Sequence, residues 1–303
     1  MKRWRCLTTP GNSPPAAFTP QSWTIVVVFV ALCACRHPVS WASEIGKEAQ
    51  HAPSTAVAPA WPHPLLGERL SFHGRWLGIP VGRGWIEVKE IVSLNGRQAY
   101  HIEARGHSND ILSTFYPIRD ELHSYLDCET LQPLRFEKYQ REGRYRADEL
   151  VTFDYAASTA TYRSLLNQSV KEIRLTSDVQ DLISALYWFR RQPLQPHTTV
   201  SLNLYSDEKL YHTDIQIGEF LMLELLKRGT FPCLVVEPKA SFKGLLVKRG
   251  RLWAYVTLDE RRLPLLVKIT TPWGPMSVVL DEASIHGGAV VPMRVQRHKM
   301  DSK

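Results

Sequence analysis

The residues best suited to acid–base chemistry lie in a short polar segment, residues 119–123. Asp120 precedes His123 by three positions, and a carboxylate near a histidine is the pairing that a general base and its orienting group require. The sequence holds no nucleophile in a Gly-x-Ser-x-Gly elbow and no glycine-rich phosphate loop. Phe115-Tyr116-Pro117 instead favours a turn between two strands, in which Asp120 pairs with an arginine or caps backbone amides. We therefore predict a structural turn role for Asp120 and no catalytic residue.

A second set, His101, Glu103 and His107, carries metal-ligating groups on one face of a predicted strand. In an extended strand, His101 and His107 stand about 20 Å apart at roughly 3.3 Å per residue, which is too far to share an ion. His101 and Glu103 alone are too small a ligand set for zinc or copper. Because the sequence also lacks a Cys-x-x-Cys motif, we predict no metal site and no cofactor, and interpret these residues as a polar outer face.

Aromatic residues are the most suggestive candidates for binding. They are spread over the predicted strands and helix, and a partly open β-barrel lined by such rings can hold one hydrophobic ligand. The same rings could instead fill the core between helix and sheet, and both interpretations stay open. The candidate ligand-lining residues are Trp76, Trp85, Phe115, Tyr116, Tyr187, Trp188 and Trp253.

Period-two alternation predicts the elements that position these residues. Residues 68–76 place Leu70 and Phe72 on one side, and residues 98–107 alternate in the same way. Further alternating segments cover residues 85–90, 134–139, 149–155, 159–163, 170–175, 199–205, 211–217, 221–227, 233–237, 252–258, 265–271 and 276–280. Asp259 and Pro264 predict a structural turn between two of them, since Asp can hydrogen-bond its own turn and Pro fixes the start of the next strand. This pattern predicts a mostly β protein, an antiparallel curved sheet or open β-barrel.

One segment has a helical period instead. After Ser177, with Gln180 three residues on as a capping box, apolar residues recur at three- and four-residue spacing up to Tyr187. Two arginines suit the C-terminal end of a helix, and Pro193 ends it. We expect this single α-helix to pack on the open side of the curved sheet.

Residues 1–42 have the features of a signal peptide. Three basic residues among the first five positions precede an apolar run over residues 23–35, which is shorter than the roughly 20 residues of a spanning helix. Residues 32–35 resemble a lipobox in which Cys35 would be acylated, whereas Ser40-Trp41-Ala42 fits ordinary signal peptidase cleavage. We therefore predict a periplasmic protein, either soluble or anchored to the outer membrane through lipidation of Cys35.

Composition divides the rest of the chain. Residues 43–64, rich in Ala, Pro, His and Ser, predict a flexible linker; residues 65–283 form one β-rich domain, and residues 284–303 form a basic C-terminal tail. The net charge of +7 falls to +4 without the first 34 residues and is not gathered into a basic face, so we predict no nucleic-acid partner. Within the domain, Cys128 and Cys233 could form one disulfide in an oxidising compartment or remain two thiols.

Several motifs follow one another along this domain. They are Leu66-Gly67-Glu68-Arg69-Leu70, Trp76-x-Gly78-Ile79-x-Val81-Gly82, residues 115–120, residues 184–190, residues 229–233, and a closing block from Trp253 through Asp259 to Pro264. In type and order they resemble the bacterial envelope family called domain of unknown function 3108. The resemblance implies an exported, β-rich protein without an agreed activity. Over a short stretch, the closing block also resembles the strand–turn–strand of periplasmic lipoprotein carriers, whose half-open barrel holds acyl chains.

The predicted function is non-enzymatic. We expect an exported envelope protein that binds or carries an amphiphilic, lipid-like molecule in an open β-barrel. The alternative is a structural or assembly partner of envelope machinery. A hydrolase acting on envelope polymers would require carboxylates, or a histidine and a nucleophile, that converge in a cleft.

Overall fold

The structure of the 303-residue chain is a computed structural model, and it describes residues 48–49, 66–225, 228–240, 251–271 and 274–285. Within these ranges the chain is mostly β-strand, which confirms the predicted fold class. The strands are β1 (Glu48–Ala49), β2 (Glu68–Trp76), β3 (Ile79–Leu94), β4 (Arg97–Ser108), β5 (Arg119–Asp127), β6 (Pro133–Glu142), β7 (Tyr145–Asp154), β8 (Thr159–Ser164), β9 (Val170–Arg174), β10 (Val179–Gln180), β11 (Thr199–Ser206), β12 (Lys209–Leu225), β13 (Gly229–Ala240), β14 (Arg251–Thr257), β15 (Pro264–Thr271) and β16 (Gly274–Ile285). The helices are α2 (Asp110–Phe115) and α3 (Ser184–Arg191).

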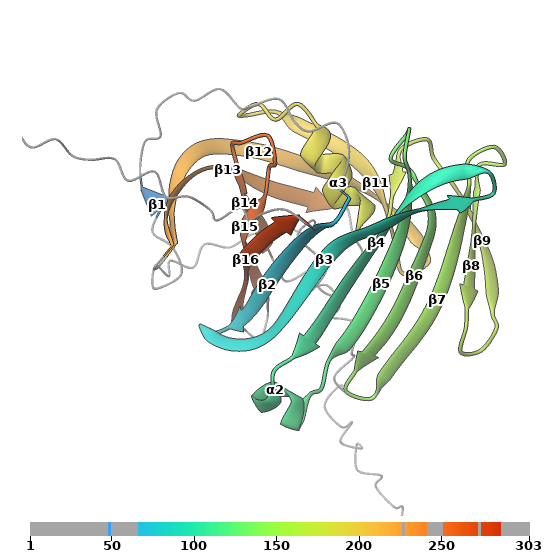
Figure 1. The fold of residues 1–303 in the computed structure, drawn as a ribbon, viewed down its shortest axis with the longest axis horizontal. Coiled ribbons are helices and arrows are strands. Elements are labelled where there is room, and N and C mark those ends of the chain that lie inside the picture. Colours follow the sequence, from blue (N-terminus) through green and yellow to red (C-terminus); the bar gives the residue numbers. More distant parts are fainter. Residues whose placement is uncertain (1–47, 50–65, 226–227, 241–250, 272–273, 286–303) are drawn as a thin grey trace, which may run out of the picture.

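The strands form one curved sheet (Figure 1). Strands β2 to β9 make an antiparallel meander, and β11 to β16 make a second one. The pairing of β16 with β2 joins the two meanders, while β10 pairs with β11 in parallel. Because β9 and β10 remain as edge strands, the described sheet is an open barrel.

The sheet curls far enough to bring the second meander against the first. The turn between β11 and β12 approaches β9, where Lys171 Nζ lies 3.4 Å from Glu208 Oε2. The ring of Tyr205 on β11 packs edge-on against Phe153 on β7, with centroids 5.7 Å apart. Side chains, and not backbone hydrogen bonds, therefore close this side of the barrel.

The apolar core lies on the inner face of the sheet. Neighbouring strands contribute buried side chains at matching register positions, such as Leu70 opposite Ile86 and Phe136 opposite Val151. Every second residue of these strands points inward, as the alternation in the sequence predicts.

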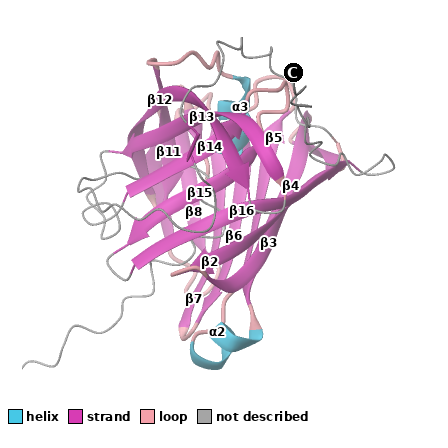
Figure 2. Cartoon of the chain, turned by 90° about the vertical axis from the view of Figure 1, so that its left-hand side faces the viewer, coloured by secondary structure: helices cyan, strands magenta, loops and turns pink. Residues whose placement is uncertain are grey.

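Helix α3 covers one end of the barrel, called here the α3 end, and α2 lies at the opposite α2 end (Figures 1 and 2). Arg190 of α3 makes a buried, bidentate ion pair with Glu68 of β2, with both N–O distances 2.7 Å. At its start, the buried carboxylate of Asp181 accepts hydrogen bonds from the amides of Ile183 and Ser184, each at 2.8 Å. A charge pair and a carboxylate cap thus fix the helix on the sheet.

The structure corrects three details of the sequence interpretation. The helix begins at Ser184 and not near Ser177, because residues 179–180 pair with β11 and Asp181 provides the cap. Of the segment expected to be a turn, residues 115–120, Phe115 ends the short helix α2, and Arg119 and Asp120 already belong to β5. Residues 211–217 and 221–225 of two segments predicted as separate strands belong to one long strand, β12, with an irregularity after Ile217.

Several predictions lie outside the described residues. These are the signal peptide, the acylation of Cys35, the linker over residues 43–64 and most of the basic tail. Among the residues that the structure describes, no helix is long and apolar enough to cross a membrane.

Candidate ligand-binding site

The seven aromatic residues predicted to line a ligand do not converge. Trp85 lies against Arg69, whose guanidinium carbon is 4.6 Å from its ring centroid, and Tyr187 is buried in α3. Phe115 is exposed on α2. Trp76, Tyr116, Trp188 and Trp253 are each half-buried at separate places. None of the seven lines either of the two cavities described below.

The first cavity lies at the α2 end, between β2, β3, β4, β16 and α2. It has an empty volume of about 460 Å³, part of which is open to solvent. Its apolar lining consists of Phe72, Val81, Leu112, Ile118, Met276 and Val278.

Small residues leave this space open. Gly74 of β2 stands opposite Gly82 of β3, and Gly84 stands opposite Gly106 of β4. Gly74, Gly82 and Gly84 also line the cavity, together with Ser108. At the α3 end the same strands fill the inner face with large side chains such as Leu70 and Ile86. The hollow therefore follows from a change in side-chain size along three adjacent strands.

Exposed apolar residues stand beside the cavity. Leu77 and Ile79, at the β2–β3 turn, are 55% and 59% exposed, and Ile111 and Phe115, on α2, are 69% and 82% exposed. We call these four residues the apolar rim. Asn109 joins the two segments, since its amide nitrogen donates to Pro80 O at 2.7 Å and its backbone N–H donates to Val81 O at 2.8 Å.

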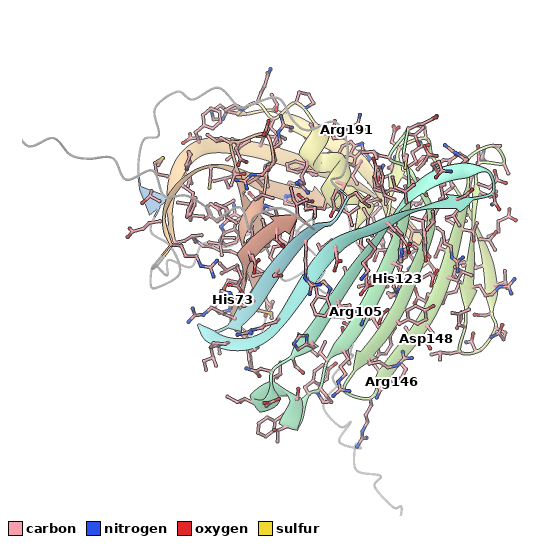
Figure 3. All side chains as sticks on the ribbon, viewed as in Figure 1. His73, Arg105, His123, Arg146, Asp148 and Arg191 are labelled. Carbon is pink, nitrogen blue, oxygen red and sulfur yellow. The ribbon has the colours of Figure 1, made fainter. Side chains whose placement is uncertain are left out.

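Basic residues flank the rim. In the strand register, Arg83 of β3 stands opposite His107 of β4, and His107 stands opposite Arg119 of β5. The three residues therefore lie in a row across the sheet. All three side chains are exposed, and Arg83 and His107 belong to the cavity lining. Arg144 and Arg146 are exposed at the β6–β7 turn; Figure 3 places Arg146 at the α2 end and Arg191 at the α3 end.

The inner face also holds buried charges. Lys138 Nζ lies 3.0 Å from both Glu149 Oε2 and Asp207 Oδ1. Burial alone would lower the pKa of Lys138, but the charges of Asp207 and Glu149 raise it well above its usual range. Burial raises the pKa of Glu149, and the charge of Lys138 offsets part of that effect. This trio therefore joins β6 and β7 to the β11–β12 turn.

Asp120 belongs to a second group, with the buried Glu142 and the half-buried Tyr116. Its Oδ1 accepts a hydrogen bond from the backbone N–H of Arg141 at 2.9 Å. Burial raises the pKa of Asp120, and hydrogen bonds from Arg141 and Glu142 offset part of the rise. A hydrogen bond between the two carboxyls needs a proton on one of them. Burial, with the charges of Glu142 and Asp120, raises the pKa of Tyr116 to about 12.

These positions correct the interpretation of Asp120. It is the second residue of strand β5, with its buried side chain on the inner face, and not a turn residue. His123 lies on the opposite face of the same strand, because the two are three positions apart. Asp120 and His123 therefore cannot act together as base and orienting group.

The histidines of the outer face bind one another and nearby carboxylates. His101 Nε2 lies 3.0 Å from His123 Nδ1, and the His101 ring stacks on Tyr125 with centroids 4.7 Å apart. Glu103 forms ion pairs with Arg105 and, at 3.8 Å, with Lys89. Across the described ranges, no three potential ligands come close enough to hold a metal ion.

A second cavity lies under α3. It has an empty volume of about 360 Å³ and is lined by Leu186 and Phe189 of the helix and by residues of β12 to β15, with Arg262 of the turn between β14 and β15. The guanidinium of Arg262 donates to Arg190 O at 2.9 Å, and burial lowers its pKa. This cavity lies beneath the helix, whereas the first has exposed apolar residues beside it.

The remaining predicted residues have structural surroundings. Asp259 lies in the turn between β14 and β15, where its Oδ1 accepts from Thr257 Oγ1 at 2.5 Å, and Pro264 is the first residue of β15. Cys128 and Cys233 are both free thiols: Cys128 is half-buried and Cys233 is buried. Burial is the main cause that raises the pKa of each thiol.

An open, curved β-sheet with an apolar cavity at one end defines a barrel-like class of protein. The family described as "Protein of unknown function (DUF3108)" matches residues 71–281, and the chain belongs to it, as its motifs predicted. No curated protein matches the chain.

Two solved structures match the chain, both with low sequence identity. One is the β-barrel-like protein of domain of unknown function DUF1849 from Brucella abortus, with 8% identity and a TM-score of 0.49, covering 74% of this chain and 99% of that one. The other is a protein with a YmcC-like fold from Bacteroides fragilis, with 8% identity and a TM-score of 0.28, covering 76% of this chain and 99% of that one.

Proposed function

We propose that the protein is exported to the cell envelope and binds one amphiphilic molecule, with the apolar part of that molecule in the cavity at the α2 end. The observation that carries this proposal is the cavity itself, which has a mainly apolar lining and exposed apolar residues beside it. Val81 and Leu112 line the cavity, and Ile79 and Ile111 lie close to them in sequence on the rim. Export is supported by the signal-peptide features of residues 1–42.

The size of the cavity limits what it can bind. Burial contributes about 0.8 kcal/mol for each methylene that enters the cavity, and micromolar binding needs about 8 kcal/mol. A short apolar chain therefore needs polar contacts outside the cavity as well. Arg83 belongs to the cavity lining and is exposed to solvent, so its guanidinium favours a ligand with an anionic headgroup.

Filling the cavity tests the proposal. A Cβ added at Gly74 meets its nearest atoms, Val81 Cγ2 and Gly82 O, at 3.7 and 3.9 Å, which is ordinary contact, so a side chain can start from this position and Gly74→Val adds bulk to the cavity lining. We expect this variant to bind a fluorescent fatty acid at least tenfold more weakly than the wild type, with an unchanged or higher melting temperature.

Ser71→Val is the matched control, because Ser71 lies on the same strand but on the opposite face. It should keep wild-type affinity. Equal affinity in the wild type, Gly74→Val and Ser71→Val would contradict binding in this cavity.

A further inference from the structure

The apolar rim does not belong to the folded core. Helix α2 has no buried residue, so Ile111 and Phe115 contribute little packing. Its start is held by the side chain of Asn109, which accepts a hydrogen bond from Leu112 N at 2.9 Å. Exposed apolar side chains on two adjacent loops indicate a surface that contacts another apolar phase.

The charge around the rim is positive. Within the described part of the chain, Arg83, Arg119, Arg144 and Arg146 form no ion pair. Strands lie about 4.8 Å apart, so Arg83 and Arg119 are roughly 10 Å from each other. The exposed acidic residue of α2 itself is Asp110.

We propose that the α2 end docks on an anionic membrane surface. The apolar rim enters the interface between headgroups and acyl chains, while the flanking arginines contact lipid phosphates. A second copy of the chain fits this surface less well, because a symmetric contact would place the arginines against one another. The inference extends the proposed function, because the cavity that holds the amphiphile would then face the bilayer.

Vesicle co-sedimentation tests the docking. The full chain is used with Cys35→Ser, so that acylation cannot provide attachment, and the vesicles contain phosphatidylcholine alone or equal parts phosphatidylcholine and phosphatidylglycerol. We expect binding to the anionic vesicles that weakens as salt is raised. Ile111→Ser and Phe115→Ser should each lower the partition coefficient about tenfold. Arg83→Gln and Arg119→Gln should each lower it about fivefold.

Matched controls lie at the α3 end. Leu66→Ser removes an apolar side chain of similar exposure, and Arg191→Gln removes an exposed arginine, and both should bind like the wild type. The inference is overturned if the wild type does not bind anionic vesicles, or if the rim variants bind them as well as the controls do. Phe115-dependent dimers in vesicle-free solution would overturn it as well, in favour of a second copy.

A separate measurement distinguishes docking from amphiphile binding. Fatty-acid affinity without vesicles should fall in Gly74→Val and stay unchanged in Phe115→Ser. The vesicle partition of Gly74→Val should equal that of the wild type. Loss of only one of these two activities in the wild type would therefore show which of the two proposals has failed.

Discussion

At the scale of single residues, the interior combines an apolar core with buried charged side chains that have hydrogen-bond or ion-pair partners. Asp181 illustrates the balance. Its carboxylate accepts a hydrogen bond from Ser124 Oγ at 2.5 Å and two more from backbone amides at the start of α3. Burial nevertheless raises the pKa of Asp181 to about 6, and the hydrogen bonds lower it only in part. The folded protein therefore holds the proton of Asp181 more tightly than the unfolded chain does.

This shift predicts a pH dependence of stability. Because the pKa of Asp181 is about 6 in the folded state and 3.8 is its ordinary value, its contribution is fully present below pH 3.8 and is lost as the pH rises through about 6. The loss amounts to roughly 3 kcal/mol, at 1.36 kcal/mol per pKa unit. In Asp181→Asn the amide oxygen can still accept from the two backbone amides and the amide nitrogen can donate to Ser124 Oγ, without a charge, so this variant should lose less stability between pH 4 and pH 7.

Urea unfolding of both proteins at the two pH values measures the difference. Parallel losses of stability in the wild type and in Asp181→Asn would show that Asp181 does not ionise with a raised pKa. Ser124→Ala serves as a control, since it removes one hydrogen bond and keeps the carboxylate.

At the scale of elements, the alternation of apolar and polar residues predicts a strand wherever the inward positions are apolar. Strand β2 was predicted with the bounds that it has, because Leu70 and Phe72 point inward. Strand β5 was missed, because its inward residues include Asp120 and Ser124, and buried polar residues hide the pattern. Helix α2 was missed as well, since a six-residue helix with no buried face leaves no periodic signal.

The site was harder to predict than the fold. Aromatic rings marked the candidate residues, but the cavity arises where side chains are small, at Gly74, Gly82 and Gly84. The sequence carries this signal as small residues at inward positions of adjacent strands. This signal can be recognised only when the strand register that sets Gly74 opposite Gly82 is known. Pairing between strands is a long-range property that alternation within each strand does not determine.

The cap of α2 leads to a prediction about this element. Asn109 accepts from Leu112 N and donates to Pro80 O, so Asn109→Ala removes the helix cap and the tie to β3. We expect a loss of about 1 kcal/mol in the free energy of unfolding and faster amide exchange in residues 110–115. Asn109→Asp keeps the cap but not the donor, and should be intermediate. Unchanged exchange in Asn109→Ala would mean that other contacts hold α2.

At the scale of the whole molecule, the two ends of the barrel differ. The α3 end is covered by a helix held through a buried ion pair between Arg190 and Glu68. The α2 end has a partly open cavity, an exposed apolar rim and flanking arginines. This asymmetry supports the proposal that an amphiphile binds at the α2 end while the α3 end stabilises the fold.

Photo-crosslinking tests the binding of an amphiphile at the α2 end most directly. A fatty acid with a photoreactive group at the end of its chain is mixed with the purified protein and irradiated, and the labelled peptides are identified by mass spectrometry. The structure predicts labels on residues lining the cavity, within β2, β3 and β16, and competition by unlabelled fatty acid. Labels confined to α3 and its neighbouring strands, or labelling that no competitor reduces, would contradict a ligand site at the α2 end.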